Sequence, residues 1–490
     1  MLRLRTAGLF SAMRGEQIVK ACCSGTYAFE ANCSGGVLMS SLKGINKYIW
    51  TMVAAVGLVL MGSTRLQAIT SYARQTGLPC SSCHTIPPEL TPFGRSFKLN
   101  GYTMTGMPQI TAKPARQEAG LSLNRYMPIA AFIQFAYSGT NRPRPGTENW
   151  NFEFPQSASL FLAGAMSDHV GSFIQVTYDA QADHFSWDNT DVRYSNRKTF
   201  AGKDLVYGFT FNNNPTVEDL WNDTPAWGFP WVSPNQTPTP MAGTLIDGGL
   251  AQDVGGVGAY AMWNDHLYGA AAVYRSAHIG NPQPNDGTCC NINIRGAAPY
   301  WRLAWQQTMG NNYLEVGTYG MHTASTPGGI MGPEDFFTDV AADAQYERVL
   351  PTLNNNTISV HTTYIHESTN LEATYGLGGA AMPNHDLSTF KLDGTYHFRN
   401  KYGATAGYFR TWGTADPLLY AQQPIDGSGN GSPDSDGYIL QLAYWPWQNI
   451  DFTAQYTGYL KFNGGTTSYD AAGRNASDNN AAYFTAWFIF

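Results

Sequence analysis

The chain has 490 residues, of which 43% are hydrophobic, 13% aromatic and 13% charged, and its net charge is −7. The charged fraction is about half that of a typical soluble domain, roughly 25%. The aromatic content excludes a disordered chain, and the acidic balance disfavours a nucleic-acid binder. A mean hydropathy of −0.27 is too polar for a bundle of transmembrane helices. These values favour a large all-β protein.

Residues 39–68 predict a secretory signal peptide. Lys43 and Lys47 form a positive start, residues 49–62 an apolar core, and residues 66–68 (LQA) a cleavage site. A membrane anchor is the alternative, but the apolar run is short for one. We therefore expect an exported protein.

The residues before this signal, 1–38, show no hydrophobic periodicity. We interpret them as a non-native or unstructured extension, and Met39 as a better start than Met1. Seven of the 29 Lys and Arg residues, but only two of the 36 Asp and Glu residues, lie within residues 1–68. The exported part is therefore more acidic than the whole chain.

The strongest chemical signal is the sequence CSSCH at residues 80–84. Two thiols at this spacing, Cys80 and Cys83, can add to the two vinyl groups of a haem, and the adjacent His84 then faces the iron. A structural disulfide or half of a zinc site is the alternative, but no second ligand pair with zinc spacing lies nearby. The motif predicts one covalently attached haem c, with His84 as the proximal ligand.

The distal haem ligand is less defined. Met104 and Met107 follow the motif, and a Met thioether on the iron would raise the reduction potential. Both side chains could instead pack on the porphyrin, with the sixth position open or filled by His. The segment of residues 69–118 is too short to bury a haem alone. We expect the rest of the chain, residues 119–490, to cover it.

Strict alternation of apolar and polar residues marks the rest of the chain. In residues 450–463 every second side chain, from Ile450 to Phe462, is apolar or small, and polar groups mostly fill the positions between. Residues 357–367 and 388–399 repeat the pattern. This period of two is typical of a strand between lipid and a wet lumen. A soluble sandwich also alternates, but it explains the loop lengths less well.

Sixteen candidate strands follow one another, joined by alternating short and long connections. Tight turns follow the second, sixth, eighth, twelfth and fourteenth strands, and long polar loops the fifth, seventh, thirteenth and fifteenth. This alternation predicts a 16-stranded antiparallel outer-membrane β-barrel with its N-terminus on the periplasmic side. The predicted strands are 124–137, 152–166, 169–180, 187–195, 203–213, 254–264, 267–276, 298–309, 312–322, 335–346, 356–368, 387–399, 402–412, 436–447, 450–463 and 480–490.

Some polar residues of the predicted lumen and loops carry weaker signals. Cys289 and Cys290 are adjacent in the loop after the seventh strand, where loop stapling or metal capture are the hypotheses. Charged and imidazole groups on the lumen face could line an ion path, although such groups are more often solvated channel walls. They are His361, Lys391, Asp393, His397 and Arg399.

Several runs of the sequence resemble a known family. Residues 72–79 (YARQTGLP) and 87–102 (PPELTPFGRSFKLNGY) flank the haem motif, and residues 212–221 (NNNPTVEDLW) and 225–230 (PAWGFP) lie further on. They are similar to the fused monohaem cytochrome–porins of iron-oxidising bacteria. The resemblance covers residues 69–490 and is most specific around the haem motif.

This resemblance implies an outer-membrane oxidoreductase that takes electrons from Fe(II) at the cell surface. A periplasmic cytochrome or copper protein would accept them, and the haem segment would plug or cap the periplasmic mouth of the barrel. By position, Cys80 and Cys83 hold the haem and His84 ligates the iron, with no catalytic residue beyond the haem. The rival hypotheses are a conduit for a non-iron donor and a solute porin whose haem is structural. The expected partners are Fe(II), the periplasmic acceptor and outer-membrane lipid, without nucleic acid.

Overall fold

The computed structural model describes residues 70–104, 111–112, 123–124, 127–180, 183–277, 293–327, 331–353 and 356–490. The chain divides into two compact units, Met1–Gln67 and Ala68–Phe490, and every described residue belongs to the second. The expected signal peptide and extension, Met107 and the pair Cys289 and Cys290 lie outside the described residues. Among the described residues, no helix is long and apolar enough to cross a membrane.

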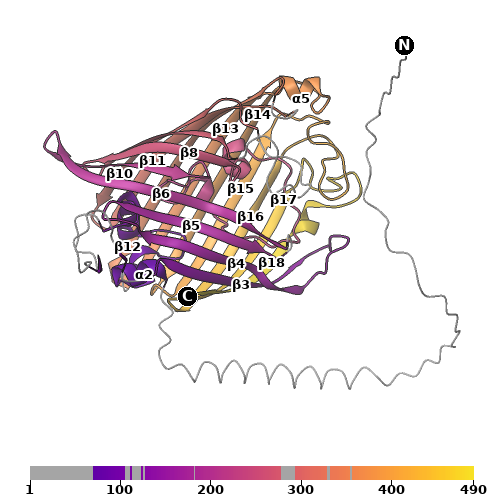
Figure 1. Cartoon of the computed structure of the whole chain (residues 1–490). Helices are drawn as coiled ribbons and strands as arrows, with labels where there is room; N and C mark the ends of the chain where they lie inside the picture. Colours follow the sequence, from indigo (N-terminus) through magenta and orange to yellow (C-terminus); the bar gives the residue numbers. More distant parts are fainter. Residues whose placement is uncertain are drawn as a thin grey trace, which may run out of the picture. The chain divides into compact units, whose positions relative to one another are not determined.

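Sixteen strands, β3 to β18, form one closed antiparallel barrel in which neighbours in sequence are neighbours in space (Figure 1). The last strand closes the barrel against the first, with Ala481 opposite Thr140 and Ile489 opposite Phe132. Closure leaves no strand edge unpaired, which confirms the predicted barrel and excludes the sandwich. The strands are β3 (Ile129–Thr140), β4 (Asn151–Ala165), β5 (Val170–Asp179), β6 (His184–Phe200), β7 (Lys203–Asn212), β8 (Val254–Trp263), β9 (Leu267–Ser276), β10 (Ala298–Met309), β11 (Asn312–Ser325), β12 (Asp335–Leu350), β13 (Asn356–Asn370), β14 (Asn384–Phe398), β15 (Tyr402–Gly413), β16 (Ser435–Trp447), β17 (Ile450–Lys461) and β18 (Ala481–Ile489).

The predicted and observed strands differ mainly at a few ends. β3 begins at Ile129 rather than at residue 124, and β12 continues to Leu350 instead of ending at residue 346. β6 is much longer than the predicted 187–195, because its pairing with β7 runs on until Phe200 lies opposite Lys203. The sequence of β6 is rich in polar residues, so apolar and polar residues do not alternate clearly at its ends. The backbone hydrogen bonds to β7 continue there nevertheless.

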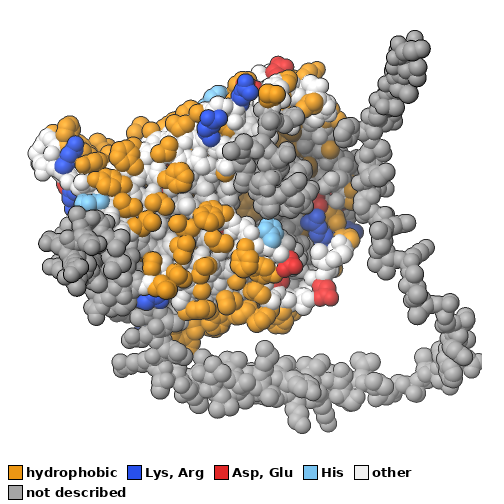
Figure 2. All heavy atoms as spheres, viewed as in Figure 1, with side chains coloured by type: hydrophobic (Ala, Val, Ile, Leu, Met, Phe, Trp, Pro, Cys, Tyr) orange, Lys and Arg blue, Asp and Glu red, His pale blue; other side chains and the backbone are white. Residues whose placement is uncertain are grey.

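The barrel wall is apolar on its outer face, whereas its inner face carries polar groups beside hydrophobic clusters. On β17, Phe452 is 42% exposed on the outer face, whereas Asp451, on the inner face, is only 2% exposed. Figure 2 shows hydrophobic side chains gathered over the wall, while the charged side chains seen in this view lie toward the ends of the strands. This distribution is that of a barrel with lipid outside and polar groups within.

Two side chains lie elsewhere than the alternation predicted. Phe462 was expected on the lipid face, but β17 ends at Lys461, and the Phe462 ring is fully buried against Tyr469 in the following loop. Arg399 was expected on the lumen face, but it lies in the turn after β14. Its guanidinium stacks 4.9 Å from the centre of the Phe398 ring. Both residues follow the last residue of a strand, where alternation no longer decides which way a side chain points.

The connections alternate in length as predicted. The chain passes from β8 to β9 within residues 264–266, and from β16 to β17 within 448–449. The long loops include residues 213–253, between β7 and β8, and residues 414–434, between β15 and β16. Because antiparallel strands reverse direction at each connection, the short turns gather at one end of the barrel and the long loops at the other.

The longest of the fully described connections, residues 213–253, enters the barrel and is called the inner loop. Trp221 lies inside the wall, with its indole N–H 2.5 Å from the Tyr313 hydroxyl of β11. Further along, the N–H of Leu245 donates to a carboxylate oxygen of Glu367 on β13 at 2.5 Å. Buried residues of the loop and inward-facing strand residues form two shared hydrophobic clusters. The core of the molecule therefore lies inside the barrel.

Candidate functional site

The motif-bearing segment, residues 70–104, contains three short helices: α2 (Ser71–Thr76), α3 (Cys80–Cys83) and α4 (Pro92–Leu99). α4 begins in the usual way, because the Thr91 hydroxyl accepts from the N–H of Gly94 and Pro92 occupies the first turn. α2 ends at Gly77, whose φ of 71° is readily adopted by glycine. These two caps end α2 before α3 and begin α4 after it, so they fix the turns on either side of α3. Two further strands, β1 (Thr111–Ala112) and β2 (Leu123–Asn124), pair only with each other.

This segment packs against the inner face of the barrel. The Tyr102 hydroxyl donates to the Asp191 carboxylate of β6 at 2.7 Å, and both groups are buried. Arg95 and Glu347 of β12 form an ion pair at 2.5 Å. The backbone N–H of Cys80 lies 3.3 Å from the side-chain oxygen of Gln448, in a short turn. The segment is therefore held at the end of the barrel that carries the short turns.

Cys80, Cys83 and His84 lie together, as the motif requires. Both cysteines are free and half-buried, and burial raises the pKa of the Cys83 thiol to about 11. The Nδ1 atom of His84 lies 3.2 Å from the carbonyl oxygen of Glu89. Burial lowers the pKa of His84 to about 4, so its ring is neutral at physiological pH. With Nδ1–H donated to a carbonyl, the Nε2 lone pair is left for a metal.

A cavity of about 520 Å³ separates this segment from the barrel wall. Its volume is within the range of small-molecule and cofactor sites, roughly 300–1,000 Å³. Its lining is mostly apolar and aromatic, which suits a flat conjugated ring. The lining includes Cys80, Cys83, His84 and Phe97 of the segment, Phe132, Phe161 and Trp487 of the wall, and Trp227 and Trp231 of the inner loop. The thiols, the free imidazole nitrogen and this lining fit a covalently attached haem.

Lys98 is a charged residue of this cavity that the sequence did not single out. It is buried, and its ammonium group lies 2.9 Å from the Asn222 side-chain oxygen and 4.7 Å from the centre of the Trp227 ring. Burial and the nearby Arg193 lower the pKa of Lys98 to about 7. Lys98 therefore adds an amine that titrates near neutral pH to the lining of this cavity.

The two methionines remain untested as haem ligands. Met104 is half-buried at the end of the described segment, and the described residues that line the cavity do not include it. Met107 lies outside the described residues. The distal ligand therefore stays a prediction.

Glu89 connects the motif to the barrel wall and was also not singled out by sequence. One of its carboxylate oxygens lies 3.1 Å from Nε2 of His397 and 3.2 Å from the Ser359 hydroxyl. The other accepts from the Thr395 hydroxyl at 3.3 Å. Burial would raise the pKa of Glu89, but His397 and then His361 lower it to about 2. Since Glu89 also holds His84 through its carbonyl, the wall orients the imidazole.

The lumen residues predicted to be solvated are instead largely covered. His397 is buried beneath Glu89, and the nearby His361 is buried with its Nδ1 atom 3.1 Å from Asp393. Lys391 forms an ion pair at 2.6 Å with Asp247 of the inner loop. The alternation predicted correctly that these side chains face inward. It could not show that another part of the chain would lie on them.

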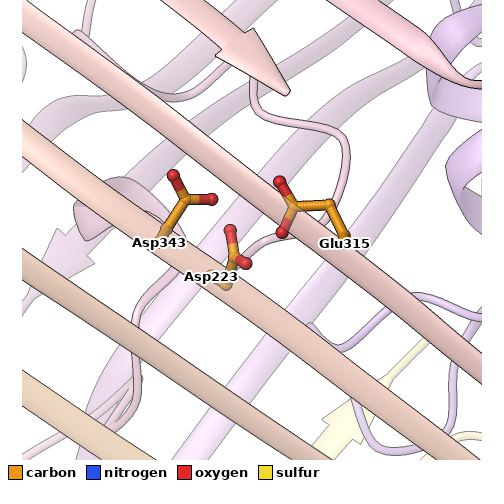
Figure 3. A group of neighbouring side chains, drawn as sticks. All are labelled: Asp223, Glu315 and Asp343. Atoms are coloured by element: carbon orange, nitrogen blue, oxygen red, sulfur yellow. The ribbon is translucent and has the colours of Figure 1, made fainter. Parts of the chain in front are cut away.

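A second polar cluster lies where the inner loop meets β10, β11 and β12. The Arg302 guanidinium of β10 contacts Asp343 at 2.6 Å and Asp219 at 3.0 Å. Glu315 and Asp223 lie 3.5 and 3.6 Å from the same nitrogen. Burial would raise the pKa of Asp219, but Arg302 and Lys98 lower it to about 2. Figure 3 shows three of the carboxylates, Asp223, Glu315 and Asp343.

No family model and no curated protein sequence matches this chain significantly. Solved structures that resemble it include outer-membrane proteins and porins. They include a loop-deletion mutant of OmpT from Vibrio cholerae, with a TM-score of 0.41, 12% identity, and coverage of 74% of this chain and 98% of that one. The channel DcaP of Acinetobacter baumannii has a TM-score of 0.43, 10% identity and coverage of 74% and 96%. An anion-selective porin from Comamonas acidovorans has a TM-score of 0.42, 9% identity and coverage of 74% and 98%. All three TM-scores are below 0.5 and all three identities are below 25%. The assignment of this chain as a closed barrel is therefore based on its own strand pairing.

Proposed function

We propose that this protein is an outer-membrane electron-transfer protein that carries one haem c and oxidises Fe(II). The observation that carries the proposal is the cavity into which Cys80, Cys83 and His84 all face. When bound there, haem c supplies a one-electron Fe(III)/Fe(II) couple. The two thiols would hold it as thioethers, and Nε2 of His84 would ligate its iron.

The protein's own residues would tune this site in three ways. The Glu89 carbonyl fixes the His84 ring and makes it a stronger ligand through the Nδ1 hydrogen bond. The aromatic part of the lining would shield a bound haem from water, and lower exposure to solvent changes its reduction potential. The barrel surrounds the site and insulates it from other reactants. Oxidation of Fe(II) removes one electron and needs no general acid or base, so no further catalytic residue is required.

The outer membrane is the proposed location because the wall is apolar outside and closed. Sixteen strands with short turns at one end and long loops at the other are typical of outer-membrane barrels. In that orientation the segment with Cys80 and His84 would lie on the periplasmic side, where a soluble cytochrome or copper protein would accept the electron. Acidic groups of the loops and lumen would favour the approach of Fe²⁺.

One observation bears on the rival hypotheses. The inner loop occupies part of the lumen, with buried contacts to inward-facing residues of several strands. A wide path for solutes is therefore disfavoured relative to electron transfer. A donor other than iron remains the alternative, because the choice of Fe(II) rests on the resemblance of the sequence.

The test is anaerobic addition of Fe(II) to the oxidised, detergent-purified protein, followed by its visible spectrum. We expect the band of a reduced c-type haem to appear rapidly, and His84→Ala to weaken or shift it. Dithionite gives the control for full reduction. A haem that dithionite reduces but Fe(II) does not would overturn the iron assignment and favour another donor. Absence of any haem band would overturn the cytochrome assignment.

A further inference from the structure

Three carboxylates of the cluster beside the haem cavity could share one cation. Asp223 belongs to the inner loop, and Glu315 and Asp343 belong to the neighbouring strands β11 and β12 (Figure 3). Each offers an oxygen, and these oxygens all lie within 4.8 Å of one another. Oxygen ligands at 2.0–2.4 Å from one ion are at most about 4.8 Å apart, so a single divalent cation can reach all three.

The positive charge present does not balance these groups. Arg302 is the guanidinium at the centre, and the Lys98 ammonium donates to the Asp219 carbonyl. Four buried carboxyl groups nevertheless lie within 3.6 Å of one Arg302 nitrogen. Isolated buried carboxylates are strongly unfavourable, so the cluster needs further positive charge or protons. A proton is therefore the competitor that any cation must displace.

Unpartnered oxygens give a second and separate indication of a ligand. Asp223 is only 4% exposed, yet among the described residues neither of its carboxylate oxygens accepts a hydrogen bond from an N–H or hydroxyl group. Glu315 is fully buried, and its Oε2 is unpartnered as well. Arg302 reaches Glu315 through the other oxygen, at 3.5 Å. Buried carboxylate oxygens normally have partners, so these atoms are available to a bound ion.

A small cavity of about 20 Å³ borders Asp223 and extends toward His361 and Asp393. Such a volume holds about one water molecule. Neither Glu315 nor Asp343 lines this cavity, so it meets the cluster at Asp223. The neighbouring residue, Asn222, lines both this cavity and the haem cavity. An ion bound by Asp223 would therefore lie next to the wall of the haem cavity.

We infer that Asp223, Glu315 and Asp343 bind one divalent cation inside the barrel. Hard oxygen ligands of this kind suit Mg²⁺, Mn²⁺ and Fe²⁺ rather than soft metals. That the physiological ion is Fe²⁺ on its way to the haem rests on the proposed function. The site itself rests only on the geometry of the cluster.

Mn²⁺ is the probe of choice, because free Mn²⁺ has a six-line electron paramagnetic resonance spectrum that weakens on binding. The haem-loaded, oxidised protein in detergent is titrated with Mn²⁺. We expect about one bound ion, and at least a tenfold weaker affinity in Asp223→Asn and in Glu315→Gln. Asp478→Asn, in an outer loop, is the matched control and should bind as the wild type does. An unchanged haem spectrum and unchanged migration of the folded barrel on a gel show that a variant has folded.

Absence of Mn²⁺ binding, or equal binding by wild type and Asp223→Asn, would overturn the site. In that case protons, and not a metal ion, would neutralise the cluster. Because Asn resembles a protonated Asp, Asp223→Asn should then be at least as heat-resistant as the wild type. Mn²⁺ does not reduce the haem, so this test is separate from the test with Fe(II). A protein that binds Mn²⁺ through Asp223, but whose haem Fe(II) does not reduce, would keep the cation site and lose the iron-oxidising function.

Discussion

At the scale of single residues, the orientation of His84 is fixed by a chain of contacts that ends on the barrel wall. Its Nδ1 atom is bound to the Glu89 carbonyl, and the Glu89 carboxylate is held by Ser359, Thr395 and His397. A ligand ring that is held before the metal arrives loses less freedom on binding. Glu89 is therefore a positioning residue for the proposed haem ligand.

Gly94 tests how closely α3 and α4 must approach. A Cβ added to Gly94 would lie 2.2 Å from the carbonyl oxygen of Cys83, much closer than atoms can pack. We expect Gly94→Ala to separate the two helices at a cost of about 1–3 kcal/mol and to lower haem content. The measurement is the ratio of haem absorbance to protein in purified material. Gly243→Ala is the control, because a Cβ there meets nothing within 4 Å. Equal haem content in both variants would contradict the prediction.

At the scale of elements, one aspartate joins two of the long loops. Asp416 lies in the loop between β15 and β16 and accepts from the N–H groups of Ala381 and Met382 in the loop between β13 and β14, at 2.7 and 3.2 Å. It also lies 2.9 Å from Nε2 of His385. These contacts fasten the two loops to each other near the end of the barrel opposite the short turns.

Removal of the Asp416 side chain should loosen both loops. We expect Asp416→Ala to be cut several-fold faster by a protease within residues 371–383 or 414–434, while haem content stays unchanged. Asp386→Ala, at an exposed position nearby, is the control. Limited proteolysis followed by mass spectrometry identifies the cut sites. Cleavage at the wild-type rate would show that the loops hold without this residue.

The same contacts predict a pH dependence. Burial would raise the pKa of Asp416, but the N–H of Leu419 and the His385 ring lower it to about 2. A lowered pKa stabilises the folded loops above the ordinary carboxyl pKa of about 4, and this stabilisation is lost as the pH falls through about 2. We expect protease resistance at these loops, measured with an acid-active protease, to fall over that range in the wild type. Asp416→Ala should show little change over the same range.

The sequence predicted the elements well and their contacts poorly, for a physical reason. The alternation of apolar and polar residues depends only on neighbours in the sequence. It therefore predicted β17 and the inward direction of Asp451. The position of Arg302 among four carboxylates depends on strands and a loop separated by many residues, and no local pattern contains it. The CSSCH motif predicted His84 as a ligand, whereas the role of Glu89 appears only when the opposite wall is in place.

At the scale of the whole molecule, the barrel has its hydrophobic core inside. The inner loop is anchored at its far part by the Leu245 contact with Glu367 and by the ion pair between Asp247 and Lys391. Its near part, around Trp227, lines the cavity that Cys80 and His84 also line. One part of the loop therefore fills space in the lumen, and another part lines the proposed cofactor site.

This division makes the two roles separable. We expect the double variant Glu367→Ala, Lys391→Ala to release the far part of the inner loop and raise ion conductance in planar bilayers several-fold. Haem content should stay unchanged, because the near part keeps its own contacts. Gln455→Ala shortens another lumen-facing side chain and is the control. Conductance unaltered by the double variant would show that the loop does not limit the passage of ions.

The closure of the barrel has a consequence for the proposed attachment of a haem. Trp487 and Ile489 of the last strand line the same cavity as Cys80 and His84. The earliest and the latest described parts of the chain thus line one cavity. In a chain whose final strand is not yet in place, the CSSCH motif would lack this part of its surroundings, and both thiols would be more accessible. If a haem is attached as proposed, we therefore expect attachment to be faster before β18 pairs with β3 than after.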